Sequence, residues 1–226
     1  MARPTTPESA NHNEAAAVSP GNPCPFLRAA VAGGYIDPHT EPVSRVADLI
    51  AEASGGTPTH KRKVRIGSVA IAAVANGLGP LAVLHNLVDG LHADALHGGP
   101  LDKRGAGSRI LDSHGELTPA ELDRLDEFAA DFQRPDGGGT ERGLGLPQLR
   151  TMMDANYAHA AGARRKVDRL LMNGEWPVLL SVMGNGNGEG DGAYLSLAEV
   201  RVLFTERKLP ARIAARISRF VRPAKR

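Results

Sequence analysis

Apolar residues recur at helical spacing in several stretches of this chain. Residues 44–53 read SRVADLIAEA, with apolar positions three and four residues apart behind a serine that suits a helix N-cap. At 118–121 a threonine, a proline and a glutamate stand where an N-cap, a first helical residue and a capping-box partner belong, which predicts a helix over 119–132. The pattern at 196–199 repeats the capping box ahead of a helix that Pro210 ends.

Three further stretches extend the helical pattern. Residues 64–88 are rich in Ala, Val and Leu and contain Asn-Gly and Gly-Pro pairs, which predicts a mostly buried helix, a break and a second helix. Residues 147 to 172 place apolar side chains on one face, and residues 26–31 form a short apolar helix that two glycines end. No pair of alternating strands flanks a hairpin turn. We therefore predict an all-α fold, a single-domain helical bundle with few or no strands.

The length of 226 residues fits one domain with a core large enough to surround a cofactor as big as a porphyrin. We expect residues 1–20 to be a disordered leader, 21–212 the folded domain and 213–226 a basic tail in solvent. A formal net charge of +2 is too balanced to indicate a nucleic-acid or membrane partner. The first twenty residues contain no apolar run of the kind that secretion signals need, so we expect a cytoplasmic protein.

The candidate chemistry begins at Cys24, the single cysteine, which lies between Pro23 and Pro25 directly before the short apolar helix. A helix N-terminus lowers the pKa of a thiol, Pro25 suits the first helical turn, and Pro23 keeps the approach extended. Such a rigid, electropositive position suits an axial thiolate ligand of haem, a thiol nucleophile or a redox sensor. A small buried side chain is the commoner role of a cysteine outside a disulfide, and the residues alone leave these readings open.

The stretch 22–36, NPCPFLRAAVAGGYI, resembles the opening of the fungal chloroperoxidases and unspecific peroxygenases, which are haem-thiolate peroxidases. The positions that match the family are Cys24, Leu27, Gly34 and Tyr35, whereas Arg28, Ala32 and Gly33 replace polar residues of the family. The resemblance implies a haem-thiolate peroxidase-like bundle that binds haem b. It makes Cys24 the axial ligand of the iron and places Pro23, Pro25 and Leu27 beside the cofactor.

Two later blocks are similar to the same family. Residues 92–104 reproduce the His-to-His spacing of its Glu-His-Asp motif, so that His97 falls on the motif histidine. The oxygen ligands with which the family holds magnesium or manganese are absent here, and we expect no metal besides the haem iron. Residues 173–178, the Gly/Asn-rich loop 184–192 and the residues up to Pro210 resemble the C-terminal half of the family, which implies that Glu175 is the distal glutamate.

The implied function is a peroxygenase or peroxidase that uses hydrogen peroxide to oxidise or oxygenate a small apolar organic substrate. Glu175, with a pKa raised by an apolar pocket, would move the peroxide proton, and His97 would orient it. His114 and His92 are alternatives to His97, which would then be a surface loop residue, and Glu175 could simply occupy a first helical turn. A non-catalytic haem-binding module and a thiol-redox protein on the same scaffold are the alternative functions.

Overall fold

The structure is a computed structural model that describes residues 24–75, 90–91, 119–159, 175–186 and 192–221. Within these ranges the chain forms eight α-helices, one 3-10 helix and three strands. The elements are α1 (Pro25–Ala32), α2 (Val43–Ser54), α3 (Pro58–Ala75), α5 (Pro119–Phe128), β1 (Ala130–Gln133), β2 (Thr140–Gly145), α6 (Leu146–His159), α8 (Glu175–Met183), β3 (Tyr194–Ser196), α9 (Leu197–Thr205), α10 (Ala211–Arg216) and η3 (Ser218–Phe220).

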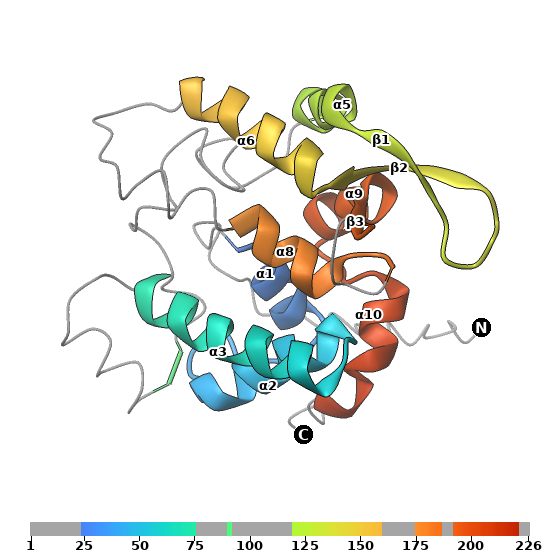
Figure 1. The fold of residues 1–226 in the computed structure, drawn as a ribbon. Helices are drawn as coiled ribbons and strands as arrows, with labels where there is room; N and C mark the ends of the chain where they lie inside the picture. The colour runs from blue at the N-terminus through green and yellow to red at the C-terminus, as the bar shows by residue number, and fades with distance from the viewer. Residues whose placement is uncertain (1–23, 76–89, 92–118, 160–174, 187–191, 222–226) are drawn as a thin grey trace, which may run out of the picture.

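The elements form two groups with α1 and α8 between them in the view of Figure 1. The lower group holds α2 and α3, which pack on each other, and α10, which packs on α2. The upper group holds α5, α6, α9 and the sheet, with α6 and α9 both against β2. Helix α8 joins the groups because it contacts α2 on one side and α6 and β3 on the other.

One continuous cluster of apolar side chains fills the interior of the described residues. Its largest fully buried members come from both groups of elements and include Leu49 of α2, Met152 of α6, Trp176 of α8 and Leu203 of α9. The indole of Trp176 stacks on Phe204 of α9, with the ring centroids 5.9 Å apart. Because burial of such side chains is the dominant favourable term in folding, the start of α8 is fixed firmly against α9.

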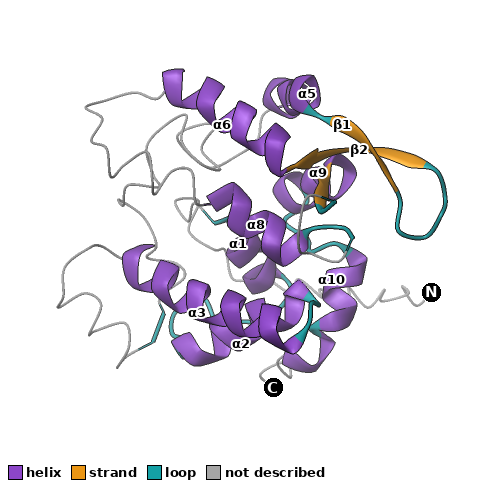
Figure 2. Ribbon diagram, viewed as in Figure 1, coloured by secondary structure: helices purple, strands orange, loops and turns teal. Residues whose placement is uncertain are grey.

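The prediction of an all-α fold is wrong, because the described residues include an antiparallel sheet with the strand order β1-β2-β3 (Figure 2). The helix predicted over 119–132 ends at Phe128, and β1 begins at Ala130. Strand β1 pairs with β2 from Ala130 opposite Gly143 to Gln133 opposite Thr140. Four residues are too short for a clear alternating pattern, and β2 contains two glycines and only one β-branched residue, so propensity gave no sign of a hairpin.

The two glycines of β2 make room for aromatic rings on the sheet. A Cβ on Gly143 would lie 2.5 Å from the ring of Tyr194, and a Cβ on Gly145 would lie 3.0 Å from the ring of Phe132. With that space open, the rings of Phe132 and Tyr194 stack 4.4 Å apart at an interplanar angle of 11°. Glycines that weaken strands in isolation therefore stabilise this sheet, since they admit a stacked pair that crosses it.

Glu141 of β2 ties the third strand to the hairpin. Its carboxylate accepts a 2.7 Å hydrogen bond from the hydroxyl of Tyr194 and another of 2.7 Å from the hydroxyl of Ser196. Ser196 is the N-cap residue of α9, as the sequence predicts, but its hydroxyl does not cap the helix. The capping-box interaction expected at Ser196 is therefore replaced by a bond to the sheet.

The remaining helices agree with the sequence in part. The helices predicted at 26–31 and 44–53 correspond to α1 and α2, each within two residues of the expected ends. Helix α3 begins at Pro58, earlier than the predicted 64, and α6 covers the first half of the predicted 147–172. The predicted break after residue 75 and the second half of 147–172 lie outside the described residues.

The C-terminal stretch was expected to leave the domain at residue 213. It forms α10 and η3, and the side chains of Ile213, Ile217 and Phe220 are buried against the core. These three side chains recur at intervals of three and four residues, the spacing of one helical face, between arginines that face solvent. The described residues up to Phe220 are therefore part of the packed structure.

Alkaline pH should destabilise the protein through Tyr194. Burial of the phenol and the neighbouring Glu141 raise its pKa above the usual value of 10.0. The folded state therefore holds the phenolic proton where the unfolded state releases it, and stability that is complete below pH 10 is lost as pH rises further. The free energy of unfolding should fall by up to about 1.4 kcal/mol per pH unit. Urea titrations from pH 9 to 11 measure it, and Tyr194→Phe should give a flatter profile; an identical slope in both proteins would contradict the prediction.

Candidate functional site

Cys24 is the N-cap residue of α1, with extended backbone angles of φ −84° and ψ 107°. Pro25 occupies the first helical position, where its missing N–H costs no hydrogen bond. The carbonyl of Cys24 accepts a 3.1 Å bond from the amide of Arg28, which closes the first turn. The side chain of Cys24 is partly exposed and packs against the apolar core. Its sulfur therefore lies where the positive end of the helix dipole favours a thiolate.

Helix α1 is held rigidly at both ends. The side chains from Pro25 to Val31 are all buried, and they include Leu27, which the resemblance places beside the cofactor. After Ala32 the chain turns at Gly34, whose φ of 71° is readily adopted only by glycine, and the amide of Tyr35 bonds to the carbonyl of Ala30 at 2.9 Å. This glycine turn is the helix end that the sequence predicts. An immobile helix fixes the direction in which Cys24 can bind a ligand.

Arg28 is a charged side chain that the sequence reasoning did not select. It is 3% exposed and lies one helical turn after Cys24, so the two residues share a face of α1. A buried guanidinium is costly unless anionic or polar groups surround it. The only sequence signal for Arg28 is its position, four residues after the cysteine in an otherwise apolar helix.

Glu175 is the first residue of α8. The described part of this residue is its backbone, and the neighbouring Trp176 is buried against α9. Helix α1 also packs on α9. The helix that carries Cys24 and the start of the helix that carries Glu175 thus share one neighbour, although they are about 150 residues apart in the sequence. A first helical turn is also the position at which the dipole favours an ionised carboxylate.

The other residues expected at the site lie outside the described part of the chain. These are Pro23 and His97, together with His92 and His114, the alternatives to His97. Among the described residues no three His, Cys, Asp or Glu side chains group as metal ligands. No described helix is long and apolar enough to cross a membrane.

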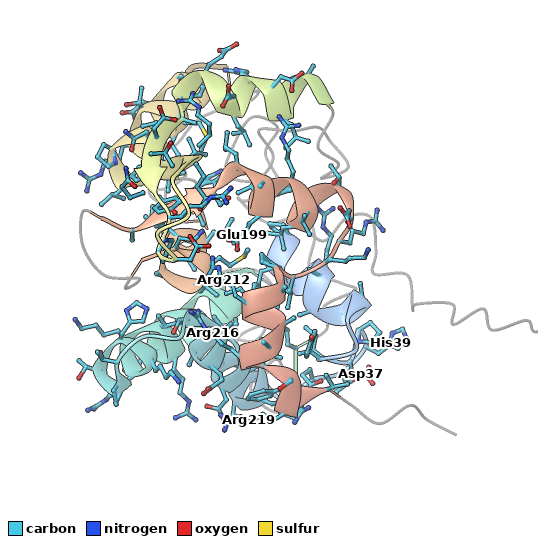
Figure 3. All side chains as sticks on the ribbon, turned by 90° about the vertical axis from the view of Figure 1, so that its right-hand side faces the viewer. Asp37, His39, Glu199, Arg212, Arg216 and Arg219 are labelled. Carbon is cyan, nitrogen blue, oxygen red and sulfur yellow. The ribbon has the colours of Figure 1, made fainter. Side chains whose placement is uncertain are left out.

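A buried histidine and an ion pair both contact the last turn of α8. His60 of α3 is buried, and its Nε2 lies 3.1 Å from the carbonyl oxygen of Ser181. Arg212 of α10 donates to both carboxylate oxygens of Glu199, at 2.7 and 2.6 Å, and to the carbonyls of Met183 and Gly184. Figure 3 shows Glu199 and Arg212 directed at each other from α9 and α10. The last carbonyls of every helix lack hydrogen-bond donors within the helix, and these groups bond to them. Their role here is therefore structural.

Comparison of the chain with protein-family models, with curated proteins and with solved structures finds no match.

Proposed function

We propose that this protein is a haem-thiolate peroxygenase or peroxidase that uses hydrogen peroxide to oxidise or oxygenate a small apolar organic molecule, with Cys24 as the ligand of a haem b iron. The observation that carries the proposal is the position of Cys24, the N-cap of a buried and rigid helix that begins with proline. It fits the resemblance of residues 22–36 to the haem-thiolate peroxidases.

The donors around Cys24 suit haem. A thiolate is the soft ligand that sets the reactivity of the iron in such enzymes. The dipole of α1 stabilises the negative charge of this thiolate. Arg28, on the same face, supplies a buried cation of the kind that pairs with a carboxylate, and haem carries two carboxylates. When bound, a haem with an axial thiolate supplies cleavage of the O–O bond of peroxide, which electron donation from sulfur favours. No separate magnesium or manganese ion is part of this proposal.

The remaining steps belong to side chains of this chain. Cys24 would hold the cofactor, with Pro25 and Leu27 beside it as the resemblance implies. Glu175 would accept a proton from hydrogen peroxide and return it to the oxygen that leaves as water. His97 positions that carboxylate. Aromatic residues are only 4% of the chain, so aliphatic side chains supply most of the surface for an apolar substrate.

The full-length protein, expressed with a haem precursor, tests the proposal directly. We expect a Soret band and a carbon monoxide difference peak at the position typical of thiolate ligation. Cys24→Ser should abolish the thiolate signature and leave the melting temperature within a few degrees of the parent, since an oxygen replaces a sulfur of similar size at a partly exposed N-cap that favours serine. A colourless protein or a nitrogen-ligated spectrum would contradict the proposal.

A further inference from the structure

Positive charge is concentrated on α3 and on the C-terminal helices α10 and η3, around α2. The cations are Lys61, Arg62, Lys63 and Arg65 of α3 with Arg216 and Arg219 of the C-terminal helices, and the carboxylates among them are Asp48 and Glu52. We call these eight residues the basic surface. Six cations against two carboxylates give it a net charge of +4, whereas the whole chain carries +2. The ion pairs that adjoin it, of Arg45 with Glu41 and of Arg212 with Glu199, are neutral in themselves.

Glu52 joins the two parts of the basic surface. Its Oε2 lies 3.2 Å from the ammonium of Lys61 and 2.9 Å from the guanidinium of Arg219, although these cations are 158 positions apart in the sequence. Figure 3 shows Arg216 and Arg219 in the lower part of the molecule, where α10 packs on α2 beside the teal helix α3. The fold therefore assembles this surface from segments that are remote along the chain.

The positive charges of α3 lie near its N-terminus, where they disfavour the helix. Its first turn contains no acidic residue, and Lys61, Arg62 and Lys63 follow directly, close to the helix end at which the dipole favours negative charge. Arg62 and Lys63 are exposed and take part in no ion pair within the described residues. Burial and the positive charge of Arg212 also lower the pKa of Arg216. Excess positive charge of this kind is compensated when an anionic partner binds.

Apolar side chains at the margins of the basic surface distinguish between anionic partners. Ile66, which is 62% exposed, and Val221, which is 50% exposed, are the two large hydrophobic side chains that the described residues leave exposed. Ile66 follows Arg62 and Lys63 on the same outer face of α3, and Val221 lies two residues after Arg219. Nucleic acid binds the cations through its phosphates but provides little apolar surface for such side chains. A bilayer provides phosphate for the cations and hydrocarbon for the apolar side chains.

We propose that the basic surface, with Ile66 and Val221 at its margins, docks the protein peripherally on a bilayer that contains anionic phospholipid. Cations bind the headgroups, and the two apolar side chains enter the interface between headgroups and acyl chains. The proposal is independent of the haem chemistry and requires no membrane-spanning helix. It revises the expectation of no membrane partner, which rested on the net charge of the whole chain.

Co-sedimentation of the full-length protein with vesicles tests the proposal. We expect binding to vesicles of equal parts phosphatidylserine and phosphatidylcholine, little binding to phosphatidylcholine alone, and weaker binding as salt rises. Each cation near an anionic surface changes binding by about fivefold, so R62Q/K63Q should lower the partition coefficient by about 25-fold. Ile66→Ser should lower it severalfold at every salt concentration.

A matched control separates this surface from net charge. R134Q/R150Q removes the same charge from exposed positions in the hairpin connection and α6, at the opposite end of the molecule in Figure 1, and should bind vesicles like the parent. Equal losses in both double variants, or no binding to the anionic vesicles, would overturn the proposal. Binding to duplex DNA that Ile66→Ser leaves unchanged, without vesicle binding, would overturn it in favour of a nucleic-acid partner. Circular dichroism confirms that each variant is folded.

Discussion

Glu175→Gln is expected to slow peroxide-dependent turnover by about 10²–10⁴-fold, the effect of losing a general acid-base group. Glutamine has the size of glutamate and holds the start of α8 equally well, but its amide cannot accept and return a proton. The loss should therefore fall on kcat, while the Soret spectrum and the affinity for substrate stay near those of the parent. Steady-state kinetics on the haem-loaded protein measure it.

Glu127→Gln is the matched control for this experiment. Glu127 is an exposed glutamate of α5, so the substitution removes the same charge at a position without a role in the proposal. Turnover by the Glu127 variant should equal that of the parent. If Glu175→Gln retains full turnover as well, Glu175 only occupies the first turn of α8 and another group moves the proton.

Arg212→Met should lower the free energy of unfolding by about 2–4 kcal/mol, less than the cost of breaking a fully buried pair because both side chains are about a quarter exposed. The substitution keeps the length of the side chain, leaves the Glu199 carboxylate without its guanidinium, and removes the donors to the carbonyls of Met183 and Gly184. Urea denaturation followed by circular dichroism measures the change.

The ion pair of Arg201 with Asp123 provides the comparison. Its nitrogen and oxygen are 3.2 Å apart, but the side chains are 45% and 74% exposed, and neither closes the end of a helix. Arg201→Met should therefore cost less than about 1 kcal/mol. Similar losses in the Arg212 and Arg201 variants would show that α8 does not depend on Arg212. Adding Glu199→Gln to Arg212→Met should restore part of the lost stability, because it removes the stranded charge.

The sequence predicts α1 and the start of α5 well because their signals are local. A proline at position 25 or 119 sets a helix start, and the glycines at 33 and 34 set an end, in each case within one or two residues. The sheet could not be predicted in this way. The stacking of Phe132 on Tyr194 and the bonds of Glu141 join segments more than fifty positions apart, and no local window contains both partners.

The part of the candidate site that contains Cys24 could be predicted from the sequence. A cysteine between two prolines before an apolar run indicates a thiol at a helix N-terminus, and α1 has that form. The burial of Arg28 was not predictable, since an arginine is usually exposed and its 3% exposure arises only once α1 has packed into the fold. The role of His97 stays a prediction, because it rests on a motif outside the described residues.

The net charge of the whole chain gives no indication of the basic surface, for a simple reason. A sum over all residues carries no information about position, and the acidic residues of α5 and β1 offset the cations of α3 only in that sum. Charges on opposite ends of a folded protein do not neutralise each other toward a partner, since screening confines their fields to about 8–10 Å. A count for each surface of the folded chain is therefore the more informative quantity.

The arginine that closes the C-terminal end of α8 is added to the growing chain well after the helix itself. Arg212 follows Met183 by 29 positions, and a chain without it lacks the guanidinium that donates to the carbonyls of Met183 and Gly184. A translation product interrupted between the two would carry an α8 with a frayed C-terminal turn. We therefore expect chains that stall before α10 has been made to be cleaved by proteases more readily than chains in which α10 has docked.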